Sequence, residues 1–324
     1  MLKVLIGKTF MIKLLEFSLS NRGFYREFES VFFNMFKAKR ASNRYLGKNF
    51  SFCVAELKEK RILVLFDLDD GSGITPCRQG ILDGDCKLDF SKLEKLKSDY
   101  NIENKNIIVF KAQLNRHECE YYPFKEKVYP LGYFSGNYEY IKNIQQDLKV
   151  EKDIDLLWLG TVNLDATPWN WPENQDIGMW SSGWRIKGYK LLESLKKERK
   201  DLNIVFGNKK VAKKDYFDLV SRAKICLELP GCGWFTKRFV ENILLEKCIL
   251  SMRQKQLLPF KLIENVHYHS MGENLDNLEK EVDNLLSNKN LISDYEENTK
   301  SIKNNYNLLN LAENVFKKIN RELL

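Results

Sequence analysis

The sequence predicts an α/β protein with two domains, residues 1–150 and 151–324, and helices at its C-terminal end. First, 324 residues exceed what one hydrophobic core commonly takes up and fit two domains of about 150 residues. Second, short apolar segments alternate with longer segments of helical period, and the alternation starts again at Asp155–Gly160 after the polar stretch Asn137–Val150. Such alternation is typical of parallel sheets with crossover helices.

In the first domain, apolar runs predict a series of short strands. These are Leu2–Ile6, Phe50–Glu56, Arg61–Phe66, Ile107–Phe110 and Val128–Leu131, with a polar helix over Leu88–Tyr100. A further helix over Phe24–Met35 carries aromatic residues at helical spacing, and basic residues surround it. Its apolar face either packs into the core or lies on an anionic membrane surface, where cations meet the lipid headgroups.

In the second domain, the same criteria predict five strands and several helices. The strands are Asp155–Gly160, Leu202–Phe206, Ile225–Leu229, Cys248–Ser251 and Val266–Ser270. Arg185 and Lys187 open a helix that reaches Lys200, and a short helix covers Tyr216–Ala223. From Asn274 to the end the chain is helical, with a break at Asn288–Asn290.

Composition narrows the classes of partner. The net charge of +8, from 52 basic and 44 acidic residues, suits an anionic ligand or an acidic membrane face. The seven cysteines include no CxxC pair and favour free thiols in a reducing cytosol. Three histidines are too few for a convincing zinc site, and no apolar run reaches about 18 residues. We therefore expect a cytoplasmic protein without a bound metal, with peripheral contact at the inner membrane face as an open alternative.

An acidic, glycine-rich stretch, Asp67-Leu-Asp-Asp-Gly-Ser-Gly73, follows the strand Arg61–Phe66. It departs from a calcium-binding EF-hand loop at its fifth position, and Asp70 interrupts the nucleophile motif of haloacid dehalogenases. We favour an acidic loop at the carboxyl end of a strand, which is the ligand edge of α/β sheets. Asp67, Asp69 or Asp70 would then act as general base toward a hydroxyl group. A solvated acidic turn is the alternative.

The most informative stretch joins a buried strand, Ile225–Leu229, to a helix through a turn that contains Gly231 and Gly233. Thr236 is a plausible N-cap of that helix. Glycines allow backbone N–H groups to approach a ligand, and a helix N-terminus favours negative charge. Arg238 and Glu241 are three residues apart, so they share one helix face near the turn. A cation that binds phosphate beside a carboxylate that binds hydroxyl groups suits a nucleotide sugar.

The pattern Leu-Pro-Gly-x-Gly-x-x-Thr-x-Arg-Phe-x-Glu, from Leu229 to Glu241, resembles the donor-site segment of GT-B glycosyltransferases, in particular their exostosin-like and bacterial spore-protein-like branches. The resemblance covers roughly residues 153–250 and departs from the family at Asn242 and Lys247. It implies two Rossmann-like domains that face each other across a cleft, with the donor in the second domain. It also implies that the last helix, Tyr306–Leu324, crosses back onto the first domain.

By this resemblance, Arg238 and Glu241 lie against the sugar nucleotide, and a basic residue at Arg185 faces the donor diphosphate. We assign the donor site to Gly160, Thr161, Arg185, Lys187, Gly231, Gly233, Thr236, Arg238 and Glu241. The family implies no metal and no cofactor beyond the donor substrate.

Three functions follow from the sequence. The first is transfer of a sugar from a nucleotide to an acceptor hydroxyl, on a glycan, a lipid-linked acceptor or another molecule. The second is modification or binding of nucleic acid, in which the tryptophans could stack on bases; these are Trp169, Trp171, Trp180 and Trp184. The third is a phosphohydrolase of the haloacid-dehalogenase type, built on Asp67 and Asp69.

Overall fold

The computed structural model is an α/β protein that divides into two compact units. It describes residues 12–18, 28, 31–32, 46, 50–68, 90–112, 114–115, 127–133, 135, 137–144, 150–162, 164, 181–207, 210–231 and 234–324. The first unit comprises the described residues up to Gly132 together with Leu308–Leu324, and the second unit comprises those of Tyr133–Asn307. The predicted α/β class is confirmed. The cleft between the units stays a prediction.

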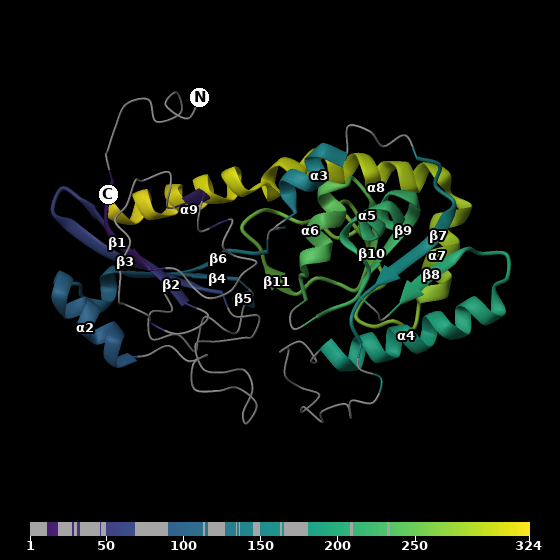
Figure 1. Ribbon diagram of the computed structural model, residues 1–324, viewed down its shortest axis with the longest axis horizontal. Coiled ribbons are helices and arrows are strands. Elements are labelled where there is room, and N and C mark those ends of the chain that lie inside the picture. The colour runs from purple at the N-terminus through teal and green to yellow at the C-terminus, as the bar shows by residue number, and fades with distance from the viewer. Residues whose placement is uncertain are drawn as a thin grey trace. The chain divides into compact units, whose positions relative to one another are not determined.

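The first unit is built on a mixed five-stranded sheet of order β1-β2-β3-β4-β6. Its strands are β1 (Lys13–Ser18), β2 (Phe50–Leu57), β3 (Lys60–Asp67), β4 (Ile107–Lys111) and β6 (Val128–Pro130), and the short strand β5 covers Leu114–Asn115. Helices α2 (Phe90–Tyr100) and α9 (Leu308–Leu323) belong to this unit (Figure 1). The predicted strand Leu2–Ile6 and most of the predicted helix Phe24–Met35 lie outside the described residues.

The predicted parallel pairing holds for only part of this sheet, which is mixed. Strands β2 and β3 pair antiparallel from Phe50↔Asp67 to Leu57↔Lys60, and only the pairs β3–β4 and β4–β6 are parallel. The reason is the length of the connection. Only Lys58 and Glu59 lie between β2 and β3, both with positive φ (50° and 69°), and a two-residue loop forms a hairpin because a parallel crossover needs a dozen or more residues.

The second unit contains a wholly parallel sheet of order β12-β10-β9-β7-β8. Its strands are β7 (Ile154–Leu159), β8 (Ile204–Gly207), β9 (Ala223–Glu228), β10 (Cys248–Ser251) and β12 (His269–Ser270), and β11 covers Gln256–Leu257. Its helices are α3 (Tyr138–Ile144), α4 (Ser181–Glu198), α5 (Lys213–Arg222), α6 (Lys237–Leu244), α7 (Leu278–Ser287) and α8 (Lys289–Ile302), as Figure 1 shows. Each of the five predicted strands has a counterpart in this sheet.

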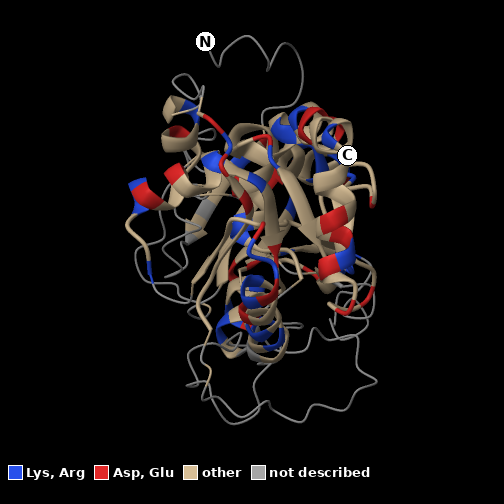
Figure 2. Cartoon of the chain, turned by 90° about the vertical axis from the view of Figure 1, so that its right-hand side faces the viewer, with Lys and Arg blue, Asp and Glu red and all other residues tan. Residues whose placement is uncertain are grey.

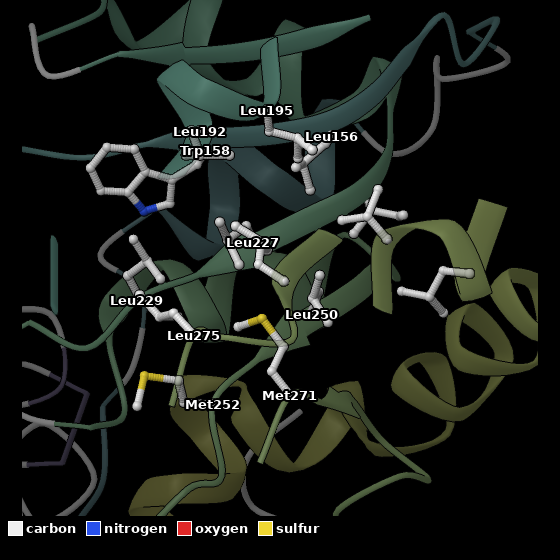
Figure 3. Packing of buried hydrophobic residues seen from close by; sticks show 14 of the residues in the cluster. Leu156, Trp158, Leu192, Leu195, Leu227, Leu229, Leu250, Met252, Met271 and Leu275 are labelled. Carbon is white, nitrogen blue, oxygen red and sulfur yellow. The ribbon is translucent and has the colours of Figure 1, made fainter. Parts of the chain in front are cut away.

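Alternate residues of the central strands form the larger core of this unit. Leu156 and Trp158 of β7, Leu227 of β9 and Leu250 of β10 point to the same side, as expected from the two-residue period of a strand. They pack against Leu192 and Leu195 of α4 and against the apolar side of α7 (Figure 3). The sheet, α4 and α7 each bury an apolar face in this core. This packing stabilises the two helices, because helical stability in proteins comes mainly from such packing.

The C-terminal helices break where the sequence predicts. Asn288 ends α7 and also caps α8, since its side chain accepts a hydrogen bond from the backbone N–H of Leu291 at 3.3 Å. Basic and acidic residues are interspersed over the face in Figure 2, in keeping with the modest net charge. In the part of the chain that the structure describes, no helix is long and apolar enough to cross a membrane.

Candidate functional site

The order of strands in the second unit indicates where a ligand site is expected. Strand β7 lies between β8, which follows it in the chain, and β9, so the strand order reverses at the β7–β9 pair. In open α/β sheets the ligand site lies outside the carboxyl ends of the strands at this point of reversal. A cavity of 290 Å³ lies there, lined by Leu159, Gly160, Thr161, Arg185, Lys210, Val211, Tyr216, Thr236, Lys237 and Arg238. We call it the switch-point cavity.

Helix α6 starts at this cavity, and its first turn is capped as predicted. Thr236 has an extended backbone (φ −104°, ψ 162°), and its hydroxyl accepts the backbone N–H of Phe239 at 3.1 Å. The same hydroxyl donates to Glu228 at the end of β9, at 2.9 Å. Because Phe239, Val240 and the following residues are buried, the helix is held tightly with its N-terminus toward the cavity.

Arg238 is positioned by its surroundings on several sides. Its Nη1 donates to the carbonyl oxygen of Leu159, and its guanidinium carbon lies 5.9 Å from the centre of the Trp158 ring. Its Nε lies 3.8 Å from a carboxylate oxygen of Glu228. Its buried Nη2 has no hydrogen-bond partner in the described part of the chain. Such an N–H group is costly to leave unpaired, so this guanidinium keeps an unused donor next to the cavity.

Arg185, near the start of α4, reaches the same cavity. Its Nε donates to the carbonyl oxygen of Pro230 at 3.2 Å, and its Nη1 donates to that of Thr161 at 3.1 Å. These bonds join the loops that follow β7 and β9. A Cβ at Gly231 would lie 2.7 Å from Nη2 of Arg185, so glycine allows the guanidinium to approach the backbone here.

The cavity is cationic. Its described lining residues include Arg185, Arg238, Lys210 and Lys237 but no carboxylate. The nearest buried acid, Glu228, has a pKa raised by burial, although Arg238 and Thr236 act in the opposite direction. A cluster of fixed cations around a small cavity at a helix N-terminus binds phosphate or another multivalent anion.

Glu241 takes part in a buried hydrogen-bond network and is not among the residues that line the cavity. Its Oε1 accepts from Ser135 at 3.0 Å and from Asn137 at 2.8 Å, and its Oε2 accepts from the Tyr216 hydroxyl at 3.1 Å. Burial, together with Glu241, raises the pKa of Tyr216 well above its ordinary value, so the phenol stays protonated as a donor. Glu241 therefore lies beside Arg238 in sequence but is already paired.

The other predicted site residues divide into three groups. Gly160, Thr161, Arg185, Thr236 and Arg238 line the cavity. Gly231 and Lys187 are absent from its lining, and Lys187 pairs with Asp276 at 2.5 Å. Gly233 lies outside the described residues.

In the first unit, Asp67 is closed to solvent. Its carboxylate lies 3.1 Å from the Lys111 ammonium, and both side chains are 0% exposed. In this state the carboxylate is inaccessible to a hydroxyl or to the phosphorus of a phosphohydrolase substrate, which favours a role in ion pairing. Asp69 and Asp70 lie outside the described residues, so a general base in this loop stays a prediction.

Four residues of this region were not assigned from the sequence: Lys210, Tyr216, Glu228 and Lys237. Glu228 and Lys237 lie inside the stretch that the sequence singles out, where a buried acid at a strand end was the available signal. Lys210 and Tyr216 belong to no recognisable sequence motif. They reach the cavity through the strand order, which brings the segment after β8 and helix α5 to it. Among the described residues, no group of three or more His, Cys, Asp and Glu side chains could hold a metal ion.

No family model and no curated protein matches the chain. Solved structures with similarity include HepE of Anabaena in complex with UDP and glucose, at 11% identity and a TM-score of 0.39, covering 71% of this chain and 67% of that one. TarM of S. aureus in a complex that includes UDP has 12% identity and a TM-score of 0.40, over 75% of this chain and 49% of that one. A glycosyltransferase from Rickettsia africae has 13% identity and a TM-score of 0.32, over 71% and 61%.

Proposed function

We propose that this protein is a glycosyltransferase that takes its sugar from a nucleoside-diphosphate sugar and that the switch-point cavity holds the diphosphate. The observation that carries the proposal is a cavity at a helix N-terminus whose described lining includes four cations, of which Arg238 keeps one donor without a partner among the described residues. The motif from Leu229 to Glu241 supports the same assignment through its resemblance to donor-site segments.

In the reaction, the bond between the anomeric carbon and the diphosphate breaks, and the diphosphate leaves with the electron pair. A new bond forms to the acceptor oxygen, whose proton passes to a base. Arg185 and Arg238 would stabilise the charge on the leaving diphosphate, with Lys210 and Lys237 beside them. A planar guanidinium binds two phosphate oxygens at once, which lysine cannot do. We assign the acceptor to the first unit, with Asp69 or Asp70 as the candidate base.

The test is calorimetric titration with a panel of nucleoside diphosphates and their sugars, on the wild type and on Arg185→Lys and Arg238→Lys. Each variant should bind roughly tenfold or more weakly, because a hydrogen bond to a charged group contributes about 1.5–3 kcal/mol. Arg222→Lys is the matched control, since Arg222 pairs with Asp153 and does not line the cavity. Unchanged affinity in both cavity variants would place the donor elsewhere, and equal losses in all three would point to a general loss of folded protein.

A further inference from the structure

A second cavity lies at the opposite end of the same sheet. Its volume is 680 Å³, and it is lined by Lys142, Val150, Lys152, Ser221, Leu245, Glu246, Lys247, Ser293, Glu296, Glu297, Lys300 and Lys303. Ser221 lies just before β9, and Lys247 directly precedes β10, so this cavity lies at the amino ends of these strands. The switch-point cavity instead lies beyond the carboxyl ends of β7 and β9. A six-residue strand such as β9 spans about 20 Å, so the two cavities are separate sites.

We call this second cavity the amino-end cavity. The charges of its described lining residues do not cancel. Its lining holds five lysines and three glutamates. The glutamates are each paired: Glu296 with Lys152 at 2.6 Å, Glu297 with Lys300 at 3.1 Å, and Glu246 with Lys303. Two lysines, Lys142 and Lys247, have no carboxylate within 4.0 Å among the described residues. Among the described lining residues, lysines therefore outnumber glutamates by two.

Lys247 is the unusual member of this pair, because its side chain is buried. The residue is 4% exposed, and its ammonium donates to the carbonyl oxygen of Ser221 at 2.9 Å. An ammonium carries three N–H donors, and this carbonyl is its hydrogen-bond acceptor in the described structure. Burial lowers the pKa of Lys247, because a buried ammonium loses its hydration. An anion in the cavity would supply both the missing charge and the missing acceptors.

We propose that the amino-end cavity binds a dianionic phosphate group, held by Lys247 at its base and Lys142 at its rim. A phosphate monoester carries close to two negative charges at neutral pH and three acceptor oxygens, which matches the excess charge and the unused donors of Lys247. Lys142 is exposed on α3, where it can meet the ligand from the solvent side. This site does not depend on the function proposed for the switch-point cavity.

The test is titration of the full chain with inorganic phosphate, followed by calorimetry and by ³¹P NMR. Lys247→Met keeps the length of the side chain and should weaken binding roughly tenfold or more, and Lys142→Met should weaken it about threefold or more, because each removes a charged hydrogen bond. Because the switch-point cavity is itself expected to bind phosphate, the titration is repeated in an Arg238→Lys background, which weakens that site. Lys190→Met, at an exposed lysine of α4 outside both cavities, should leave binding unchanged.

The proposal is wrong if wild-type protein takes up no phosphate, if only Arg238→Lys reduces binding, or if Lys190→Met reduces it as much as Lys142→Met. Succinate binding as tight as phosphate binding would also overturn the assignment to phosphate. If Lys247→Met does not fold, the exposed Lys142→Met decides the question. Binding of glycerol phosphate that depends on Lys142 then indicates a free metabolite, and sedimentation with phosphatidic-acid vesicles that depends on Lys142 indicates a lipid headgroup.

Discussion

Gly160 and Arg238 are fitted to each other: a Cβ at Gly160 would lie 2.3 Å from Nη1 of Arg238 and 2.8 Å from a ring carbon of Trp158. The missing side chain is what allows the guanidinium to reach the carbonyl oxygen of Leu159 at the end of β7. The orientation of this largely buried, anion-binding guanidinium thus depends on a residue that carries no functional group.

Gly160→Ala should therefore displace Arg238, because the arginine side chain can turn away, and it should also lower stability, because the buried Trp158 ring must shift to admit the new methyl group. We expect affinity for a nucleoside diphosphate to fall roughly tenfold, the cost of a charged hydrogen bond. Gly207→Ala is the control, since the nearest atom to its Cβ is Cδ2 of Leu159 at 3.8 Å, an ordinary contact. Equal affinities of the two variants, measured by calorimetry, would argue against a role of Gly160 in placing Arg238.

Thr236→Ala should lower the free energy of unfolding by about 1–2 kcal/mol, because the variant loses the N-cap of α6. It also leaves Glu228 with one donor fewer. Thr236→Ser keeps the hydroxyl and should regain most of this stability. Denaturant titration followed by circular dichroism measures both variants, and a serine variant as unstable as the alanine variant would mean that the methyl group, rather than the cap, matters.

Glu241→Gln should destabilise the second unit by about 1.5–3 kcal/mol, because a carboxamide cannot accept from Tyr216 on one side and from Ser135 and Asn137 on the other. Glu193→Gln, at an exposed position of α4, should change stability by less than about 0.5 kcal/mol. The sequence instead leads to the expectation that Glu241 binds donor hydroxyl groups and that its replacement leaves the melting temperature nearly unchanged. Melting temperature and donor affinity, measured on the same variant, distinguish the two roles.

The loss of stability of the folded protein at acidic pH should depend in part on Glu281. Burial by itself raises the pKa of Glu281, but hydrogen bonds from His269, at 2.7 Å, and from Asn284 outweigh it, so the pKa is lowered overall. A lowered pKa in the folded state means stability that is present above the unfolded value of about 4.3 and is lost as the pH falls through the folded value. The melting temperature of Glu281→Gln should consequently fall less between pH 6 and pH 3 than that of the wild type.

Local sequence alone determined the strand-turn-helix around Thr236, the break between α7 and α8 and the strands of the second unit. These features depend on residues close in the chain: a cap, an apolar run and a turn. Asn288 is an example, because this one residue follows the last turn of α7 and its side chain caps the first turn of α8.

Only the tertiary structure determines which distant residues lie in contact with one another. Lys111 lies 44 residues from Asp67, yet the β3–β4 pairing brings the two together and buries the acid that the sequence offered as a base. Lys210 and Tyr216 reach the cavity only because β8 and β9 flank β7. Strand order depends on the summed packing of whole sheet faces, a non-local quantity that no short motif encodes, and so the composition of the site follows from the assembled fold.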